Sequence, residues 1–276
     1  MQWNYCSNKG KEIEVIRAKI VILATGGIGG LFHNSTNFPH ITGDGIALSL
    51  KYKIKLENIH YIQIHPTTLY SENPGRRFLI SESVRGEGGY LYNRKKERFV
   101  DELLPRDMVS SAIKMQMRKE DSTFVYLSMK HLDAEKVRLR FPNIYEKCLE
   151  EGYDLTKDLI PVTPAQHYHM GGIKVDLDSQ TSMQNLFAVG EVSCNGVHGK
   201  NRLASNSLLE SLVFAERAAN VVNQKIHNIL FEEEQLLNLD RYYNIQKIQK
   251  ENKQMILREI RRKDEKFYDE WCDHAD

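Results

Sequence analysis

The residues best suited to binding or catalysis lie where a glycine-containing turn runs into an apolar stretch, at residues 197–210. Ser205 and Ser207 stand before the apolar residues as at a helix start, and helix starts direct backbone N–H groups at anions. Just before them, Arg202 carries a permanently charged fork of donors that matches a carboxylate. This segment therefore predicts contacts to both a cofactor and an acidic substrate.

Four further short segments combine His, Arg, Glu or Ser with a neighbouring Gly or Pro, which is typical of the ends of helices and strands. Taken singly, each has an ordinary structural explanation. Glu82 and Arg85 fit a surface ion pair worth under ~1 kcal/mol, and Asp44 fits a helix cap worth about 1 kcal/mol. The segments are residues 65–68, 81–89, 104–107 and 167–172.

The elements that must position these segments follow from hydrophobic periodicity. An apolar run ended by glycines predicts a strand over 13–23, and Pro105 predicts a helix start, with the helix continuing to about residue 118. Pro142 divides the helical pattern of 132–152 into two pieces. Further strands are expected at 58–64, 77–81, 89–92, 124–127, 171–175 and 186–190, and further helices at 46–52, 207–230 and 232–276.

Composition narrows the class of protein. The 276 residues contain 38 Lys and Arg against 37 Asp and Glu, so nucleic acid is not expected as a partner. Cys6, Cys148, Cys194 and Cys272 fit no metal-ligand spacing, and we expect no metal. Neither a secretion signal nor an apolar run near the ~18 residues of a membrane span is visible, so we expect a cytoplasmic protein without membrane contact.

A glycine cluster at residues 26–30 follows the first long predicted strand, as a dinucleotide-binding turn would. It lacks the spacing of the G-x-G-x-x-G fingerprint and the acidic residue that should follow it. Taken alone, it is a weak sign of a dinucleotide site.

In this order, the motifs resemble those of the flavoproteins of the succinate dehydrogenase/fumarate reductase family. The resemblance runs from about Ala18 to Ala219, and chance agreement at every motif is negligible. The motifs are Ala24-Thr25-Gly26-Gly27, Gly43-Asp44-Gly45, His65-Pro66-Thr67, Glu82-x-x-Arg85-Gly86-Glu87-Gly88, Pro105-Arg106-Asp107, His167-Tyr168, Gly190-Glu191 and His198-Gly199-x-Asn201-Arg202.

The resemblance implies an α/β plus α+β fold. Residues 1–60 and 171–231 would form the second part of a Rossmann-like FAD-binding domain, and 61–170 an inserted α+β substrate-capping domain. Residues 232–276 would begin a C-terminal helical domain. The family's first glycine motif and ribose-binding acidic residue are not found before residue 1, so we expect an incomplete cradle for the FAD pyrophosphate.

The resemblance also implies the roles of individual residues. FAD would be held by Asp44, Glu191, Ser207 and Leu208. Cations and donors would bind the substrate carboxylates, and the matching residues are His65, Ser81, His167 and Arg202. Arg106 matches the arginine that exchanges the proton, with Glu82 and Arg85 as its relay. Because guanidinium groups are poor bases near neutral pH, such an arginine works only through partners.

Within this family, two features favour the members that oxidise L-aspartate to iminoaspartate for quinolinate and NAD synthesis, with hydride passing to FAD N5 and a proton to Arg106. Ala204 and Ser205 stand where succinate dehydrogenases carry two glycines, and residues 140–162 resemble the connection found in the aspartate-oxidising members. L-Aspartate or a related C4 dicarboxylate is the expected substrate, O2 or fumarate the electron acceptor, and quinolinate synthase a candidate partner. The alternatives are a fumarate reductase or succinate dehydrogenase flavoprotein subunit, or an inactive fragment that retains only a dicarboxylate site.

Overall fold

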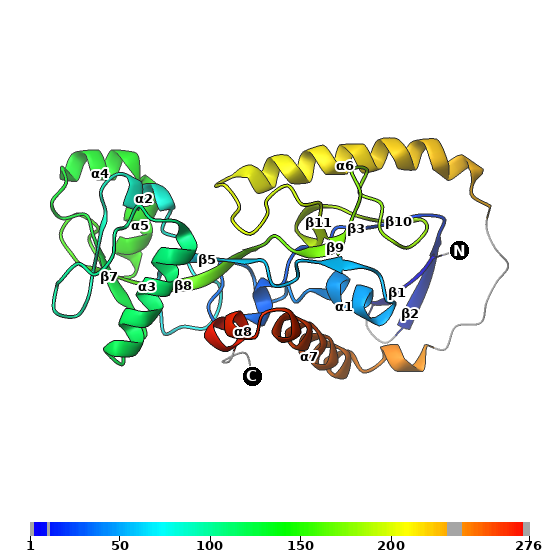
Figure 1. The fold of residues 1–276 in the computed structure, drawn as a ribbon, viewed down its shortest axis with the longest axis horizontal. Coiled ribbons are helices and arrows are strands. Elements are labelled where there is room, and N and C mark those ends of the chain that lie inside the picture. Colours follow the sequence, from blue (N-terminus) through cyan, green and yellow to red (C-terminus); the bar gives the residue numbers. More distant parts are fainter. Residues whose placement is uncertain (1–2, 10–11, 231–238, 273–276) are drawn as a thin grey trace. The chain divides into compact units, whose positions relative to one another are not determined.

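The structure, a computed structural model, describes residues 3–9, 12–230 and 239–272. The chain divides into two units (Figure 1). Unit 1 consists of Met1–Leu31, His40–Ile62 and Tyr168–Asp276, and unit 2 of Phe32–Pro39 and Gln63–His167.

Unit 1 contains small sheets made of short strands. One sheet is an antiparallel hairpin, a second is a parallel pair, and a third has three strands with β9 in the middle. In the third, glycine is required at position 171, because a Cβ there would lie 1.9 Å from the carbonyl oxygen of Asn58. The sheets are β1 (Trp3–Lys9) with β2 (Glu12–Ala18), β3 (Val21–Leu23) with β10 (Leu186–Ala188), and β4 (Leu56–Glu57), β9 (Gly172–Lys174) and β11 (Ser193–Cys194).

The helices of unit 1 bury apolar faces against these strands and against one another. Phe187 of β10, Val189 and Ala218 of the long helix α6 form one core cluster. Helix α7 packs against α1 and buries Ile256 and Ile260 completely. The helices are α1 (Asp44–Lys51), α6 (Asn206–Lys225), α7 (Ile245–Lys263) and α8 (Glu265–Trp271), with 3-10 turns η1 (Gly29–Leu31), η2 (Gly190–Val192), η3 (Ile226–Asn228) and η4 (Asp240–Tyr242).

Unit 2 is built on a four-stranded sheet in the order β5-β8-β7-β6. Its core includes Leu91, Val109 and Ile160, each fully buried. The strands are β5 (Ile62–Leu69), β6 (Tyr90–Tyr92), β7 (Val125–Ser128) and β8 (Ile160–His169), and the helices are α2 (Glu82–Gly86), α3 (Arg106–Lys119), α4 (Ala134–Arg140) and α5 (Pro142–Glu150).

The mixed α/β fold class predicted from the sequence is confirmed. Helix α5 begins at Pro142, as the predicted break in 132–152 requires. The strand expected at 77–81 is absent, and Leu79 forms only an isolated bridge to Thr68. Of the expected helical stretch 232–276, residues 232–238 and 273–276 lie outside the described residues.

Strand β8 was not predicted, although it is the longest strand of unit 2. Pro161 and Pro164 hide it in the sequence, because proline lacks the N–H that a sheet ladder uses. Within the described residues, no helix is both long and apolar enough to cross a membrane.

Candidate functional site

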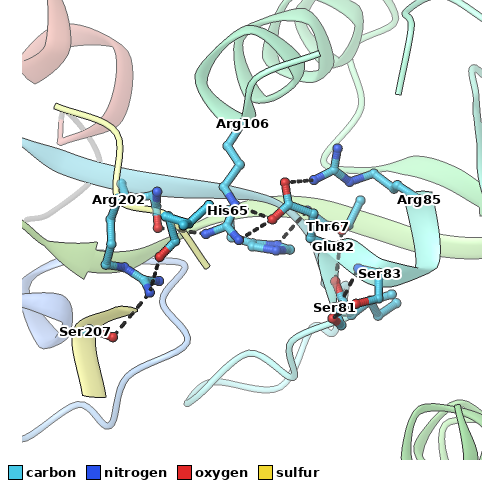
Figure 2. A network of polar contacts seen from close by, with 12 residues as sticks. His65, Thr67, Ser81, Glu82, Ser83, Arg85, Arg106, Arg202 and Ser207 are labelled. Carbon is cyan, nitrogen blue, oxygen red and sulfur yellow. Dashed lines mark hydrogen bonds and ion pairs between the residues drawn. The ribbon is translucent and has the colours of Figure 1, made fainter. Parts of the chain in front are cut away.

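Arg106 of unit 2 is held in one orientation by two side chains (Figure 2). It is the first residue of α3, directly after Pro105. Its Nε donates to Glu82 Oε2 over 3.0 Å, and its Nη2 donates to the same oxygen in a very short contact. Its Nη1 donates to Gln63 Oε1 over 2.8 Å. With its side chain only 9 % exposed, the guanidinium has little freedom to turn.

Glu82 also connects Arg106 to a second arginine. Glu82 and Arg85 lie three residues apart on α2, which brings them to one helix face, and Glu82 Oε1 is 3.7 Å from Arg85 Nη2. Arg85 is buried and donates from Nη1 to the carbonyl oxygen of Glu102 over 2.6 Å. Burial lowers the pKa of Arg85, and Glu82 opposes that effect. The three residues expected to exchange a proton are therefore neighbours in unit 2.

Ser81 begins helix α2. Its hydroxyl accepts the N–H of Ser83 over 3.3 Å and thereby caps the helix. Capping fixes the position of Glu82, the next residue, at the start of the helix. The structure thus gives Ser81 a positional role toward Glu82 in addition to its expected role as a hydroxyl donor.

His65 and His167 lie together on β5 and β8, with ring centroids 5.4 Å apart in an edge-to-face arrangement. His65 is 1 % exposed. Burial, followed by the positive surroundings of His167, Arg106 and Arg85, holds the pKa of His65 well below its ordinary value. Near neutral pH, His65 is thus an uncharged imidazole.

Two buried residues of unit 2 were missed from the sequence. Gln63, which holds Arg106, lies two residues before His65 on β5, and the strand period of two places both side chains on one face. That spacing was a usable signal. Glu102 is 3 % exposed and accepts the N–H of Leu91 over 2.7 Å. No local pattern links Glu102 to Arg85.

In unit 1, Arg202 is held by an aromatic ring and a hydroxyl. Its Cζ lies 4.6 Å from the ring centroid of Tyr168, within the range of a cation–π contact. Its Nη1 donates to Ser207 Oγ over 3.2 Å (Figure 2) and to the carbonyl oxygen of Leu203 over 3.4 Å. These contacts orient the Arg202 side chain just before the start of α6.

A buried carboxylate, Glu210, holds the ring beneath Arg202. Its Oε2 accepts from the Tyr168 hydroxyl over 3.3 Å and lies 3.6 Å from His198 Nε2. Its Oε1 accepts from Asn195 Nδ2 in a very short hydrogen bond. Burial and the neighbouring carboxylates raise the pKa of Tyr168, so that its hydroxyl stays protonated and can donate. Sequence reasoning missed Glu210 because it reads as one polar residue in a helix.

Glu191 lies in turn η2, directly after β10. Its Oε1 accepts the N–H of His169 over 2.9 Å. Gly27 leaves the space for this side chain, since a Cβ there would lie 2.3 Å from Glu191 Oε1. Burial raises the pKa of Glu191 to about 7, while the His169 N–H and Arg202 act against the shift. This carboxyl group can therefore donate or accept a hydrogen bond near neutral pH.

The remaining predicted cofactor residues lie at the starts of α1 and α6. Asp44 is the first residue of α1 and is exposed, and the cap position is taken by Gly43 with φ of 79°. Ser205, at the cap of α6, makes no side-chain cap bond, contrary to the expected capping. Ser207 lies in the first turn beside Leu208, which is 71 % exposed. The N–H groups of Asn206 and Leu208 donate to the carbonyl oxygens of Leu203 and Ser205. Fewer N–H groups at the start of α6 are therefore left to bind the expected anion.

Comparison with known proteins bears on both units. The FAD binding domain family matches residues 4–208. L-Aspartate oxidase of Clostridium perfringens is 57 % identical over 238 residues, which cover 85 % of this chain and 54 % of that protein. L-Aspartate oxidase of Clostridium acetobutylicum is 58 % identical over 219 residues, covering 79 % and 50 % respectively.

Among solved structures, E. coli quinol fumarate reductase FrdA is similar with a TM-score of 0.72 and 34 % identity, covering 90 % of this chain and 44 % of that one. The chain thus spans about half the length of the first two relatives. The predicted resemblance to the succinate dehydrogenase/fumarate reductase flavoproteins is confirmed. The chain belongs to the FAD binding domain family, whose cofactor is FAD.

Proposed function

We propose that the protein oxidises L-aspartate to iminoaspartate with FAD as its cofactor. The relatives named L-aspartate oxidase support the choice of substrate, since they are 57 % and 58 % identical to this chain. The observation that carries the proposed chemistry is the arrangement of Arg106 on Glu82 and Gln63, because it prepares one arginine for proton exchange. The reaction turns the Cα–N single bond into a C=N double bond, with loss of a hydride from Cα and a proton from nitrogen.

The residues of unit 1 suit FAD. Glu191 offers a carboxyl group, with a pKa of about 7, that can bond a ribityl or ribose hydroxyl in either direction. Ser207 adds a hydroxyl at the N-terminus of α6, where the helix dipole favours negative charge on a flavin ring. We assign Asp44 and Leu208 to the same cofactor. When bound, FAD supplies the hydride acceptor.

The residues that we propose to bind the substrate carboxylates are His65, His167 and Arg202. Arg202 provides a lasting positive charge, and its cation–π and hydroxyl contacts reduce the conformational freedom that binding would otherwise remove. His65 contributes a neutral N–H donor because its pKa is held low. Ser81 is assigned as a further donor.

Arg106 takes up the proton through its bonded partner. A guanidinium near neutral pH is a poor base, so Arg106 can accept the substrate proton only as one of its own N–H protons passes to the Glu82 carboxylate, which then releases that proton to solvent. Glu82 contacts two nitrogens of Arg106, and its side chain is 42 % exposed. It therefore offers a route from the guanidinium to solvent, and Arg85 keeps Glu82 oriented by its positive charge.

A second candidate function is reduction of fumarate or oxidation of succinate. The specific observation in its favour is the 34 % identity to a quinol fumarate reductase subunit over 90 % of this chain. Product analysis separates the two functions, because only the oxidation of aspartate releases an imine that hydrolyses to oxaloacetate and ammonia.

The test is an assay of the purified chain supplied with FAD and either L-aspartate or succinate. We expect a yellow protein and aspartate-dependent oxaloacetate, unchanged in the surface variant Arg217→Ala. Turnover of succinate without aspartate turnover would favour the second candidate. A colourless protein that binds dicarboxylates without turnover would favour the inactive fragment instead.

O2 or fumarate would reoxidise the cofactor, and quinolinate synthase would consume the imine. The electron acceptor, the partner enzyme and the cytoplasmic location expected from the sequence all stay predictions.

A further inference from the structure

The segment that leads into Arg106 carries a buried carboxylate with no role so far. Glu102 stands four residues before Arg106 and is 3 % exposed. Burying a carboxylate is unfavourable unless its oxygens accept hydrogen bonds. The donors around Glu102 therefore show which parts of unit 2 this side chain holds together.

Both carboxylate oxygens of Glu102 accept hydrogen bonds from β6 and the residues that follow it. Oε1 accepts the N–H of Leu91 over 2.7 Å and that of Arg98 Nε over 3.3 Å, and Oε2 accepts from Arg98 Nη2 over 2.6 Å. Each donor is a main-chain amide or a guanidinium, which can only donate, so the direction of each bond is fixed. The Glu102 side chain thus fastens its own segment to β6.

Arg98 is itself held on β6. It forms an antiparallel bridge to Tyr92, and its Cζ lies 3.9 Å from the ring centroid of Tyr90, within the range of a cation–π contact. Although the Arg98 side chain is 46 % exposed, its ion pair with Glu102 ends on a carboxylate that is almost completely buried. Such a pair is screened less than one between two exposed side chains. Arg98 therefore reinforces the attachment of Glu102 to β6.

The main chain of Glu102 holds the second arginine of the proposed relay. Arg85 Nη1 donates to the carbonyl oxygen of Glu102 over 2.6 Å. In the part of the chain that the structure describes, Arg85 Nε and Nη2 have no hydrogen-bond partner, and Nη2 has the ion pair with Glu82 at 3.7 Å (Figure 2). The position of the Glu102 carbonyl thus governs where this buried guanidinium, and the charge that it presents to Glu82, can lie.

Glu102 is connected to the relay from a second side through the chain itself. A turn follows it, closed by the N–H of Leu104, which donates to the carbonyl oxygen of Asp101 over 3.3 Å. The chain then enters α3, whose first residue is Arg106. One fastened segment therefore contacts Arg85 and also carries Arg106.

We propose that Glu102 is a positioning residue for the proton relay. Its carboxylate fastens the segment before α3 to β6, so that its carbonyl and the start of α3 take fixed places around Glu82. The proposal deepens the role assigned to Arg106 and rests on that proposed function. Its consequence is that loss of the Glu102 carboxylate slows proton exchange without weakening the binding of the substrate.

Hydrogen exchange tests the fastening without any turnover. Amide exchange in the FAD-supplied native chain is compared with that in Glu102→Gln, in Arg98→Gln and in the control Lys95→Gln, which changes an exposed lysine between Tyr92 and Arg98. We expect the amides of residues 98–104 to exchange about threefold to tenfold faster in the first two variants, the size expected for one hydrogen bond, and at the native rate in the control. Exchange that is no faster in either variant than in the control would overturn the proposal.

Kinetics then test the consequence. A misplacement of about 1 Å can cost ~10²-fold in rate, so Glu102→Gln should lower kcat for L-aspartate about 10- to 100-fold, with KM and FAD content unchanged. Arg98→Gln should lower kcat less, and the double variant should be no slower than Glu102→Gln, because Arg98 acts through that carboxylate. Circular dichroism checks that all variants fold. A raised KM at native kcat, or losses that add in the double variant, would contradict the positioning role.

The two measurements also separate this proposal from the proposed function. Absence of aspartate turnover in the native chain would count against the proposed function. The exchange rates would then still decide whether Glu102 fastens the segment, with faster exchange in Glu102→Gln and Arg98→Gln expected and native rates in both contradicting it.

Discussion

The two arginines assigned to the reaction are held in opposite ways. Arg106 donates to a carboxylate and an amide, Glu82 and Gln63, so a negative charge is bonded directly to its guanidinium. Arg202 lies over the face of Tyr168 and donates to the hydroxyl of Ser207, and both contacts orient its side chain. The contrast teaches that a carboxylate bonded to a guanidinium suits the proton exchange proposed for Arg106, whereas an aromatic ring and a hydroxyl suit the anion binding proposed for Arg202.

The largest expected effect on catalysis comes from replacing Arg106, which removes its contacts with Glu82 and Gln63. In Arg106→Lys, one ammonium cannot contact Glu82 and Gln63 together in the planar geometry of a guanidinium. We expect kcat for L-aspartate to fall by about 10²- to 10⁴-fold, the range of general acid–base contributions, with FAD content unchanged. Steady-state assay and flavin absorbance measure both quantities. Near-normal kcat would remove the proton-transfer role.

Removing the Arg202 side chain should chiefly weaken the binding of L-aspartate. Arg202→Ala removes a charged donor pair, so we expect KM for L-aspartate to rise about 10- to 100-fold, with a smaller change in kcat. Arg217→Ala, a change to an exposed arginine on the same helix α6, is the matched control. If apparent affinity is the same in both variants, Arg202 does not bind the substrate.

A smaller effect should follow from loosening the support of Arg202. Tyr168→Phe keeps the ring beneath the guanidinium but removes the hydroxyl, which donates a hydrogen bond to Glu210. We expect a rise in KM of about threefold to tenfold, as for one hydrogen bond. Glu216→Gln, on an exposed part of α6, should leave KM unchanged. A fall in kcat at constant KM would show that the ring acts on the chemical step instead.

The smallest expected effect concerns stability, and its dependence on pH has opposite signs for Glu191 of unit 1 and His65 of unit 2. Glu191 has a pKa raised from 4.5 to about 7, so the folded state holds its proton where the unfolded state has lost it. Its contribution to the free energy of unfolding is fully present below pH 4.5 and is lost as the pH rises to about 7. His65, with a lowered pKa, contributes fully above its ordinary value of 6.5, and its contribution is lost on acidification.

Denaturant unfolding at several pH values measures these slopes. The difference between native protein and Glu191→Gln isolates Glu191 from His169, whose pKa burial lowers to about 4 in the same unit. We expect this difference to shrink or reverse as the pH rises from 4.5 to about 7. A difference that does not vary with pH would mean that Glu191 titrates as an ordinary carboxyl group.

The comparison of the two arginines also shows what the sequence could predict. The resemblance implied that Arg106, Glu82 and Arg85 act together, and two local patterns fit their positions, because Pro105 marks a helix start and a three-residue spacing places two side chains on one helix face. Gln63 could have been found from the strand period. Local patterns therefore indicate the elements that carry these residues, whereas the contacts of Arg106 with Glu82 and Gln63 span 24 and 43 positions and follow from the tertiary structure.

The support of Arg202 and of His167 was not predictable in this way. Glu210 meets Tyr168 across 42 positions, and Thr36 meets His167 across 131. No periodicity connects residues so far apart, and β8, which carries His167 and Tyr168, was hidden by its prolines. Tertiary structure alone brings these side chains together.

The most direct test of the proton-exchange role of Arg106 is a single-turnover experiment without O2. L-Aspartate is mixed with equally FAD-loaded native protein and Arg106→Lys, and loss of the visible flavin band is followed in time. We predict rapid bleaching in the native protein and, at saturating aspartate, bleaching slowed by about 10²-fold or more in the variant. Equal bleaching rates in the two proteins would contradict the assignment of Arg106 as the group that accepts the proton.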